Sequence, residues 1–175
     1  MYPASWRQPL LFLSDFQEMP YRGSLPMLFN FEMDFADSLR CIPMMVRMNL
    51  DLCGVKVSLR QWSRFTREDR SALLNLPMEN AAQREKYQAF LVNLIRLRAE
   101  EEPVFLPPIT AAAWQKADDV PQSIRQAAIS HGVAIPSLNQ WNHLSTLQRF
   151  ALIKLTRPGH ENQNFVPALR EFFES

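Results

Sequence analysis

The chain has 175 residues, enough for one ordinary domain, and its 47% hydrophobic and 21% charged residues lie in the range of globular proteins. Nineteen Lys and Arg residues against eighteen Asp and Glu residues leave a net charge of +1. This balance argues against nonspecific binding to nucleic acid or to an anionic membrane, because both need a basic field. Four glycines are also few for the turns of a compact β-sandwich, so an all-β fold is disfavoured.

The chain contains two cysteines, Cys41 and Cys53, and three histidines. Two cysteines are too few for a disulfide framework or a four-ligand zinc site, and the histidines lack metal-binding spacing. No segment approaches the roughly 20 apolar residues of a membrane-spanning helix, and no signal-peptide core is found near the start. We therefore expect a cytoplasmic protein without a cofactor.

Residues 1–28 contain four prolines and show no regular hydrophobic period. They are predicted to form an N-terminal arm, either disordered or wrapped around the rest, and residues 29–175 a single helical domain. At the junction, alternating apolar residues favour a short extended segment, namely Phe29, Phe31, Met33 and Phe35. A helix from Asp34 onward is the alternative.

Two stretches, residues 42–76 and 120–155, share one sequence pattern. They match at a proline, an arginine, a glycine, a Gln-Trp pair and a second arginine, with one inserted residue: Pro43 and Pro121, Arg47 and Arg125, Gly54 and Gly132, Gln61-Trp62 and Gln140-Trp141, Arg70 and Arg149. Apolar residues at i, i+4 and i+8 follow each proline with helical spacing. The sequence therefore predicts two copies of one unit.

Each copy is predicted to contain a helix, a glycine stop, a short extended connection and a second, capped helix. The proline suits the first turn of a helix, and the glycine suits the left-handed residue that ends it. The second helix begins with the pattern of a capping box, Thr66 with Asp69 in one copy and Ser145 with Gln148 in the other.

Between the copies, Asn80 to about Glu102 is predicted to form a long amphipathic helix. An extended linker, a short helix and a last helix are predicted at 103–108, 110–118 and 166–173. The predicted fold class is all-α, with duplicated helical hairpins related by a pseudo-two-fold around the central amphipathic helix.

The comparison of the copies separates scaffold from candidate site. Shared residues are assigned to the shared fold, so Trp62 and Trp141 are interpreted as packing residues and Arg47 and Arg125 as partners of neighbouring carbonyls. The leading asymmetric segment precedes the first copy and contains Asp34, Asp37, Ser38, Arg40 and Cys41. Cys41 lies near a predicted helix N-terminus, a position typical of reactive cysteines, but a buried core cysteine is the alternative.

Residues 30–62, NFEMDFADSLRCIPMMVRMNLDLCGVKVSLRQW, and residues 65–77, FTREDRSALLNLP, resemble the nitrate-reductase-associated protein family. The matching strings are DFADSLRCIPM, LDLCGVKVSL and the W…F…R entry into the following helix, and the similarity extends over about residues 29–157. The resemblance implies a non-enzymatic role in the maturation or assembly of assimilatory nitrate reductase, a molybdenum-cofactor and iron–sulfur enzyme. The family has no established catalytic residues to carry over to this sequence. The partner that the resemblance implies is the reductase apoprotein.

From this resemblance and the asymmetry of the copies, we expect Asp34, Ser38, Arg40 and Cys41 to form part of the partner-binding surface. Two other classes stay open. A tandem of helix–turn–helix units would bind DNA through its second helices, although a connection of about eleven residues exceeds the usual three or four. A thiol-dependent redox protein would need an exposed Cys41. No enzyme or metal-binding motif is present.

Overall fold

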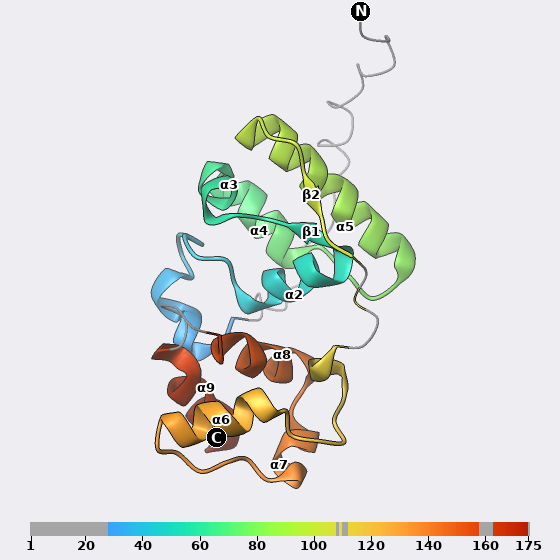
Figure 1. Cartoon of the computed structure of the whole chain (residues 1–175). Helices are drawn as coiled ribbons and strands as arrows, with labels where there is room; N and C mark the ends of the chain where they lie inside the picture. The colour runs from blue at the N-terminus through green and yellow to red at the C-terminus, as the bar shows by residue number, and fades with distance from the viewer. Residues whose placement is uncertain (1–27, 108, 110–111, 158–162, 175) are drawn as a thin grey trace, which may run out of the picture.

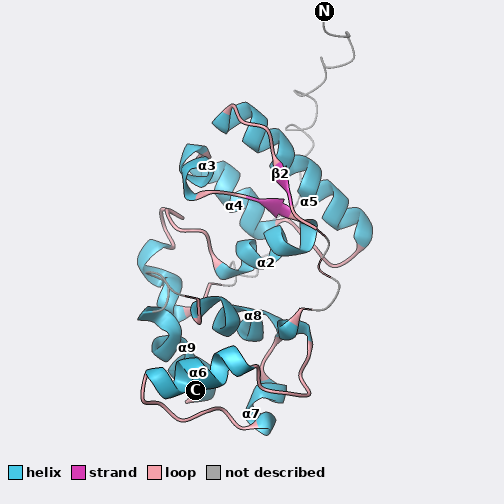
Figure 2. Cartoon of the chain, in the orientation of Figure 1, coloured by secondary structure: helices cyan, strands magenta, loops and turns pink. Residues whose placement is uncertain are grey.

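The computed structural model describes residues 28–107, 109, 112–157 and 163–174 (Figure 1). Most of these residues are helical, and the strands among them form one two-stranded sheet (Figure 2). The prediction of a mainly helical protein is confirmed. The predicted arm, apart from Leu28, lies outside the described residues. No helix in the described part of the chain is long and apolar enough to cross a membrane.

The elements follow one another with short connections. The first part of the chain contains η2 (Asn30–Phe35), α2 (Met44–Cys53), β1 (Val55–Lys56), α3 (Leu59–Arg64), α4 (Arg67–Asn75) and α5 (Ala81–Leu94), which continues as a π-helical turn, η3 (Ile95–Ala99). The second part contains β2 (Val104–Phe105), η4 (Ala113–Gln115), α6 (Gln122–Ser130), α7 (Leu138–His143), α8 (Thr146–Leu155) and α9 (Phe165–Phe173).

The segment predicted to be extended before the first copy is instead a 3₁₀ helix, η2. Its Glu32 carboxylate accepts hydrogen bonds from the backbone N–H groups of Phe29, at 3.1 Å, and Met44, at 2.8 Å. The helical turn thereby places the buried Glu32 carboxylate at the start of α2. A period of two over a few residues could not reveal this contact, because Met44 lies twelve residues further along the chain.

The first helices end at the predicted glycines, but each begins one residue later than predicted, because its proline is the N-cap residue and not part of the first turn. Pro43 and Pro121 are the residues before α2 and α6, and Gly54 ends α2 in the left-handed conformation, with φ 67°. Gly132 follows α6 with φ 65°. A side chain would be strained at such a φ, so the glycines explain where both helices stop.

The sequence predicts extended connections after the glycines. In the structure each connection also contains a short helix, α3 in the first copy and α7 in the second. Ser58 and Gln61 form a reciprocal capping box at α3, and Ser137 and Gln140 form the same box at α7. The Ser-x-x-Gln pattern was the sequence signal for these helices. The caps predicted for α4 and α8, at Thr66 and Ser145, are confirmed.

Buried side chains form two clusters, one on each side of α2. The N-terminal core includes Leu39, Val46, Trp62, Leu73, Tyr87 and Leu91, and the C-terminal core includes Met44, Ile124, Trp141, Phe150, Leu152 and Phe165. Met45 packs against both. Helix α2 lies between α5 and α8 (Figure 1). The helix in the middle is therefore α2, and α5, the predicted central helix, covers the far side of the N-terminal core.

The shared tryptophans and arginines have the structural roles that the repeat predicted. Trp62 and Trp141 are 1% and 0% exposed. Arg47 Nε donates to the Ile42 carbonyl at 2.9 Å, and Arg125 Nε donates to the Val120 carbonyl at 3.0 Å. Each arginine thus binds the carbonyl five residues before it, ahead of its own helix.

Candidate functional site

The asymmetric segment that precedes the first copy, residues 34–41, comprises the end of η2 and the first part of the connection to α2, and we call it the η2–α2 loop. Phe35, at the end of η2, and Leu39 are its buried residues, 8% and 4% exposed, and Leu39 belongs to the N-terminal core. Its neighbours Ser38 and Arg40 are exposed. Leu39 therefore anchors the loop in the N-terminal core, and the polar side chains of Ser38 and Arg40 on either side of it are exposed.

Three of the predicted site residues are in contact. The Arg40 guanidinium pairs with the Asp34 carboxylate at 2.8 Å and also donates to the Asp34 carbonyl at 3.3 Å. The Ser38 hydroxyl donates to the Phe35 carbonyl at 3.4 Å and accepts from the Arg40 N–H at 3.3 Å. The Asp34–Arg40 pair is mostly exposed, so it orders the loop surface while adding at most about 1 kcal/mol to stability.

Side chains from α3 and α4 hold the loop backbone in place through hydrogen bonds to its carbonyl groups. Trp62 Nε1 donates to the Leu39 carbonyl at 2.8 Å in a buried hydrogen bond. Arg70 donates to the carbonyls of Ser38, at 3.2 Å, and Leu39, at 3.4 Å, while its guanidinium lies 5.8 Å from the centre of the Trp62 ring. Arg67 Nε donates to the Asp37 carbonyl at 2.7 Å. Three consecutive loop carbonyls are thus fixed.

Leu39 has a φ of 49°, a left-handed conformation that costs a non-glycine residue about 1–2 kcal/mol. Burial of the leucine side chain and the bonds from Trp62 and Arg70 offset this strain. Strained backbone held in place by its surroundings is frequent at functional sites. The η2–α2 loop is therefore a surface with a fixed backbone.

Cys41, the fourth predicted site residue, is half-buried and has a free thiol. It follows Arg40 directly, but no hydrogen bond joins its side chain to Asp34, Ser38 or Arg40, so the structure brings three of the four residues together. Cys53 lies elsewhere, buried at the end of α2, and burial raises the pKa of its thiol to about 11.

The sequence did not identify Arg67 and Arg70 as part of this site. Arg70 is shared with the second copy, as Arg149, and was rightly assigned to the scaffold, since it holds backbone carbonyls. Arg67 stands where the second copy has Thr146. The same comparison that selected the loop could therefore have selected Arg67.

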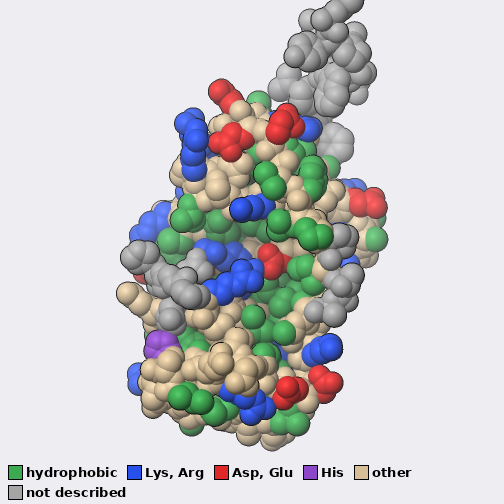
Figure 3. Space-filling model, in the orientation of Figure 1, with side chains coloured by type: hydrophobic (Ala, Val, Ile, Leu, Met, Phe, Trp, Pro, Cys, Tyr) green, Lys and Arg blue, Asp and Glu red, His purple; other side chains and the backbone are tan. Residues whose placement is uncertain are grey.

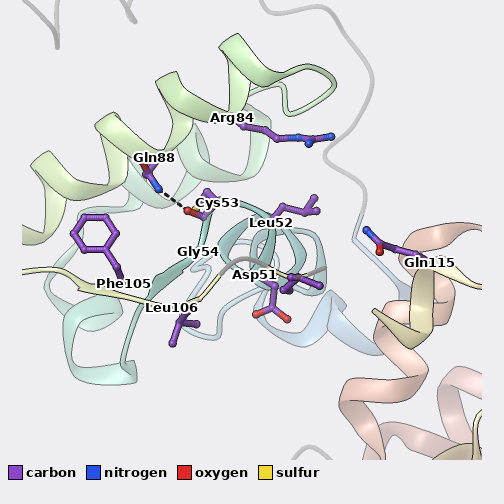
Figure 4. A pocket seen from close by; sticks show the side chains of 10 residues that line it. Asp51, Leu52, Cys53, Gly54, Arg84, Gln88, Phe105, Leu106 and Gln115 are labelled. Atoms are coloured by element: carbon purple, nitrogen blue, oxygen red, sulfur yellow. Dashed lines mark hydrogen bonds between the residues drawn. The ribbon is translucent and has the colours of Figure 1, made fainter. Parts of the chain in front are cut away.

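A hollow of about 320 Å³ lies beside the C-terminal end of α2 (Figure 4). Gln88 on α5 donates to the Cys53 carbonyl at 2.6 Å, and Arg84 lines the same wall. Asp51, on α2, pairs with Lys154 of α8 at 2.7 Å, which links the two sides of the molecule. The lining mixes charges with apolar groups, and none of the four predicted site residues belongs to it.

Among the described residues, no group of three or more His, Cys, Asp or Glu side chains is arranged to hold a metal ion. The proposed DNA-reading helix of the second copy, α8, is instead a core element. It buries Leu147, Arg149, Phe150, Ala151, Leu152 and Leu155. A helix enclosed to this extent cannot enter a major groove without leaving the core, which opposes the DNA-binding alternative.

Basic, acidic and hydrophobic side chains are mixed over the face shown in Figure 3. A family model described as conserved nitrate reductase-associated protein matches residues 28–172. The matched range contains the η2–α2 loop and both cores. Comparison with curated proteins and with solved structures finds no match.

Proposed function

Since the chain belongs to the conserved nitrate reductase-associated protein family, we propose that it is a non-enzymatic accessory factor that assists maturation or assembly of assimilatory nitrate reductase. It acts through contact with the reductase apoprotein, in the cytoplasm. The observation that carries this proposal is the family match over residues 28–172. The matched range includes all the described helices and strands except the last residue of α9.

The contact surface in this proposal is the η2–α2 loop, with Asp34, Ser38, Arg40 and Cys41. Its exposed polar groups and its fixed backbone support the assignment. A surface whose backbone is already ordered loses less conformational entropy on binding, so more of the contact energy appears as affinity. The loop is also the leading asymmetric segment, which directly precedes the first copy.

The proposal includes the internal duplication of residues 42–76 and 120–155. Both stretches run through a helix, a glycine with positive φ, a short serine-capped helix and a second capped helix. Hydrogen bonds support the same correspondence. The buried indoles of Trp62 and Trp141 both donate to carbonyls that precede their own copy, those of Leu39 and Lys116.

The test replaces all four loop side chains at once, Asp34→Ala, Ser38→Ala, Arg40→Ala and Cys41→Ala, in cells whose own copy of the gene is removed. The matched control removes another exposed ion pair by Arg96→Ala with Glu102→Ala. We expect the loop variant to stay folded, to lose co-purification with nitrate reductase and to lower the cellular activity of the reductase. The control variant should resemble the unchanged protein.

Two results would separate the parts of the proposal. Full reductase activity with the loop variant would overturn the loop as contact surface and leave the accessory role. Full reductase activity in cells that lack the protein altogether would overturn the accessory role itself.

A further inference from the structure

The two copies differ in what lies beside the stretch that follows the glycine. In the first copy β1 pairs antiparallel with β2, Val55 opposite Phe105 and Lys56 opposite Val104, and the Leu106 N–H donates to the Gly54 carbonyl at 2.8 Å. In the second copy the corresponding stretch, residues 132–135, has no strand beside it in the described part of the chain (Figure 2).

The space around the two glycines shows the same difference. A Cβ placed on Gly54 would lie 3.2 Å from the Leu106 carbonyl oxygen, whereas a Cβ on Gly132 would meet no atom of the described residues within 4 Å. The backbone groups of Ala134 and Ile135 make no hydrogen bond with any other described residue. Among the described residues, the second copy thus has an unpaired edge where the first holds β2.

Exposed apolar side chains lie within and on both sides of this edge along the chain. Ile129, Ile135 and Leu138 are 67%, 40% and 48% exposed. They lie at the end of α6, in the connection and at the start of α7, and hydrophobic side chains are visible over this part of the molecule in Figure 3. Exposed apolar residues that flank an unpaired edge indicate a surface for another chain.

The edge also lacks the charges that usually protect such edges from pairing. The sequence has no Lys, Arg, Asp or Glu between Arg125 and Arg149, whereas the first copy carries Lys56, Arg60 and Arg64 in the corresponding region. A segment that binds here should therefore be uncharged and apolar. The chain supplies a template for it in Pro-Val-Phe-Leu-Pro, residues 103–107, which contains β2 and lies along β1.

We propose that residues 132–135, flanked by Ile129 and Leu138, bind an extended, apolar, proline-flanked segment of a partner protein, which pairs with this edge as β2 pairs with β1. Backbone hydrogen bonds supply affinity in this mode, and the apolar side chains supply selectivity. This site is separate from the η2–α2 loop. It rests on the correspondence of the two copies and goes beyond the proposed accessory role.

The experiment titrates the full chain into a fluorescein-labelled peptide, Pro-Val-Phe-Leu-Pro, the sequence of residues 103–107, and follows anisotropy. A second peptide carries serine in place of phenylalanine and leucine. Leu138→Asp is compared with Leu59→Asp, because both leucines are exposed and each is the first residue of a serine-capped helix. An aspartate is favourable at that position of a helix, so both variants should fold.

We expect the first peptide to bind and the serine peptide to bind at least about tenfold more weakly. Leu138→Asp and Ile129→Asp should weaken binding by about tenfold or more, and Leu59→Asp by less than about twofold. In the β1–β2 register the backbone of Lys56 faces β2, and Ala134 takes the place of Lys56. Hydrogen exchange of the Ala134 amide should therefore slow when the peptide is saturating.

Four results would overturn the proposal. The first is absence of binding, and the second is binding that Leu59→Asp weakens while Leu138→Asp does not. The third is binding that is seen only after residues 1–27 are removed, which would make this chain's own N-terminal stretch the occupant. The fourth is self-association without peptide that Leu138→Asp abolishes, which would make a second copy of the chain the occupant.

Discussion

The carboxylate of Glu32 and the backbone N–H of Met44 are joined by a hydrogen bond of 2.8 Å. Met44 is the first residue of α2, and the residue before it, Pro43, has no side chain that could cap the helix. Glu32 thus supplies from η2 the acceptor that a capping serine or aspartate would supply. Its negative charge at this end of the helix is favoured by the helix dipole.

Glu32→Gln is expected to lower the free energy of unfolding at neutral pH by about 1–3 kcal/mol, because the amide has a single oxygen for the two N–H groups of Phe29 and Met44. Chemical unfolding in urea measures this change. Equal or higher stability of the variant would contradict this expectation.

Glu32 also makes stability depend on pH. Burial raises the pKa of its carboxyl above 4.5, against the lowering effect of the Met44 and Phe29 N–H groups and of Arg47, while the nearby Glu171 raises it further. Above pH 4.5 there is therefore a range in which the Glu32 carboxyl is protonated in the folded protein but ionised in the unfolded chain. The free energy of unfolding falls as the pH rises through this range, from about 4.5 to the raised pKa. Glu32→Gln should remove this fall, and an unchanged pH profile would contradict the assignment.

Replacing each buried tryptophan by phenylalanine tests how the η2–α2 loop is held. Trp62→Phe removes a buried bond of 2.8 Å to the Leu39 carbonyl and should cost about 1–3 kcal/mol. Trp141→Phe removes a longer, half-buried bond of 3.3 Å to the Lys116 carbonyl and should cost less. Urea unfolding compares the two, and limited tryptic cleavage after Arg40 should accelerate only in Trp62→Phe. Equal cleavage in both variants would show that Trp62 does not fix the loop.

Alanine at the two glycines tests the contact between β1 and β2. Gly54→Ala and Gly132→Ala both place a side chain at positive φ, which costs about 1–2 kcal/mol. Gly54→Ala should cost more, because its Cβ would press on the Leu106 carbonyl, whereas no described residue lies within 4 Å of a Cβ on Gly132. Thermal unfolding of the pair gives the order, and a lower stability of Gly132→Ala would contradict it.

The two thiols should differ in alkylation. Cys53 is buried and its pKa is raised to about 11, so iodoacetamide at pH 7.5 should not modify it in the folded protein. Cys41 is half-buried and should be modified slowly. Intact mass should show one adduct in the folded state and two in urea, and Cys41→Ser should abolish the first. Two adducts in the folded state would show that the end of α2 opens.

Features set by neighbouring residues could be predicted from the sequence. Thr66 with Asp69 and Ser145 with Gln148 are capping boxes in the structure, because both partners lie within one helical turn. The short helices α3 and α7 carry the same kind of cap and could have been predicted by the same rule. The pairing of β1 with β2 could not, since about fifty residues separate the two strands and nothing local indicates the partner.

The sequence could predict which residues belong to the candidate loop, but not the conformation of the loop backbone. The difference between the copies pointed to Asp34, Ser38 and Arg40, and these residues do contact one another. The left-handed Leu39 and its bonds to Trp62 and Arg70 depend on side chains more than twenty residues away. Such contacts arise only when the helices pack together.

One helix belongs to both hydrophobic clusters. Within α2, Met44 lies in the C-terminal core, Val46 and Leu50 lie in the N-terminal core, and Met45 packs against both. Neither cluster can lose its structure without exposing one face of α2, and the helix alone is too short to persist in water. The two clusters therefore share a cooperative transition, and a destabilising substitution in one of them should lower the midpoint of a single unfolding curve.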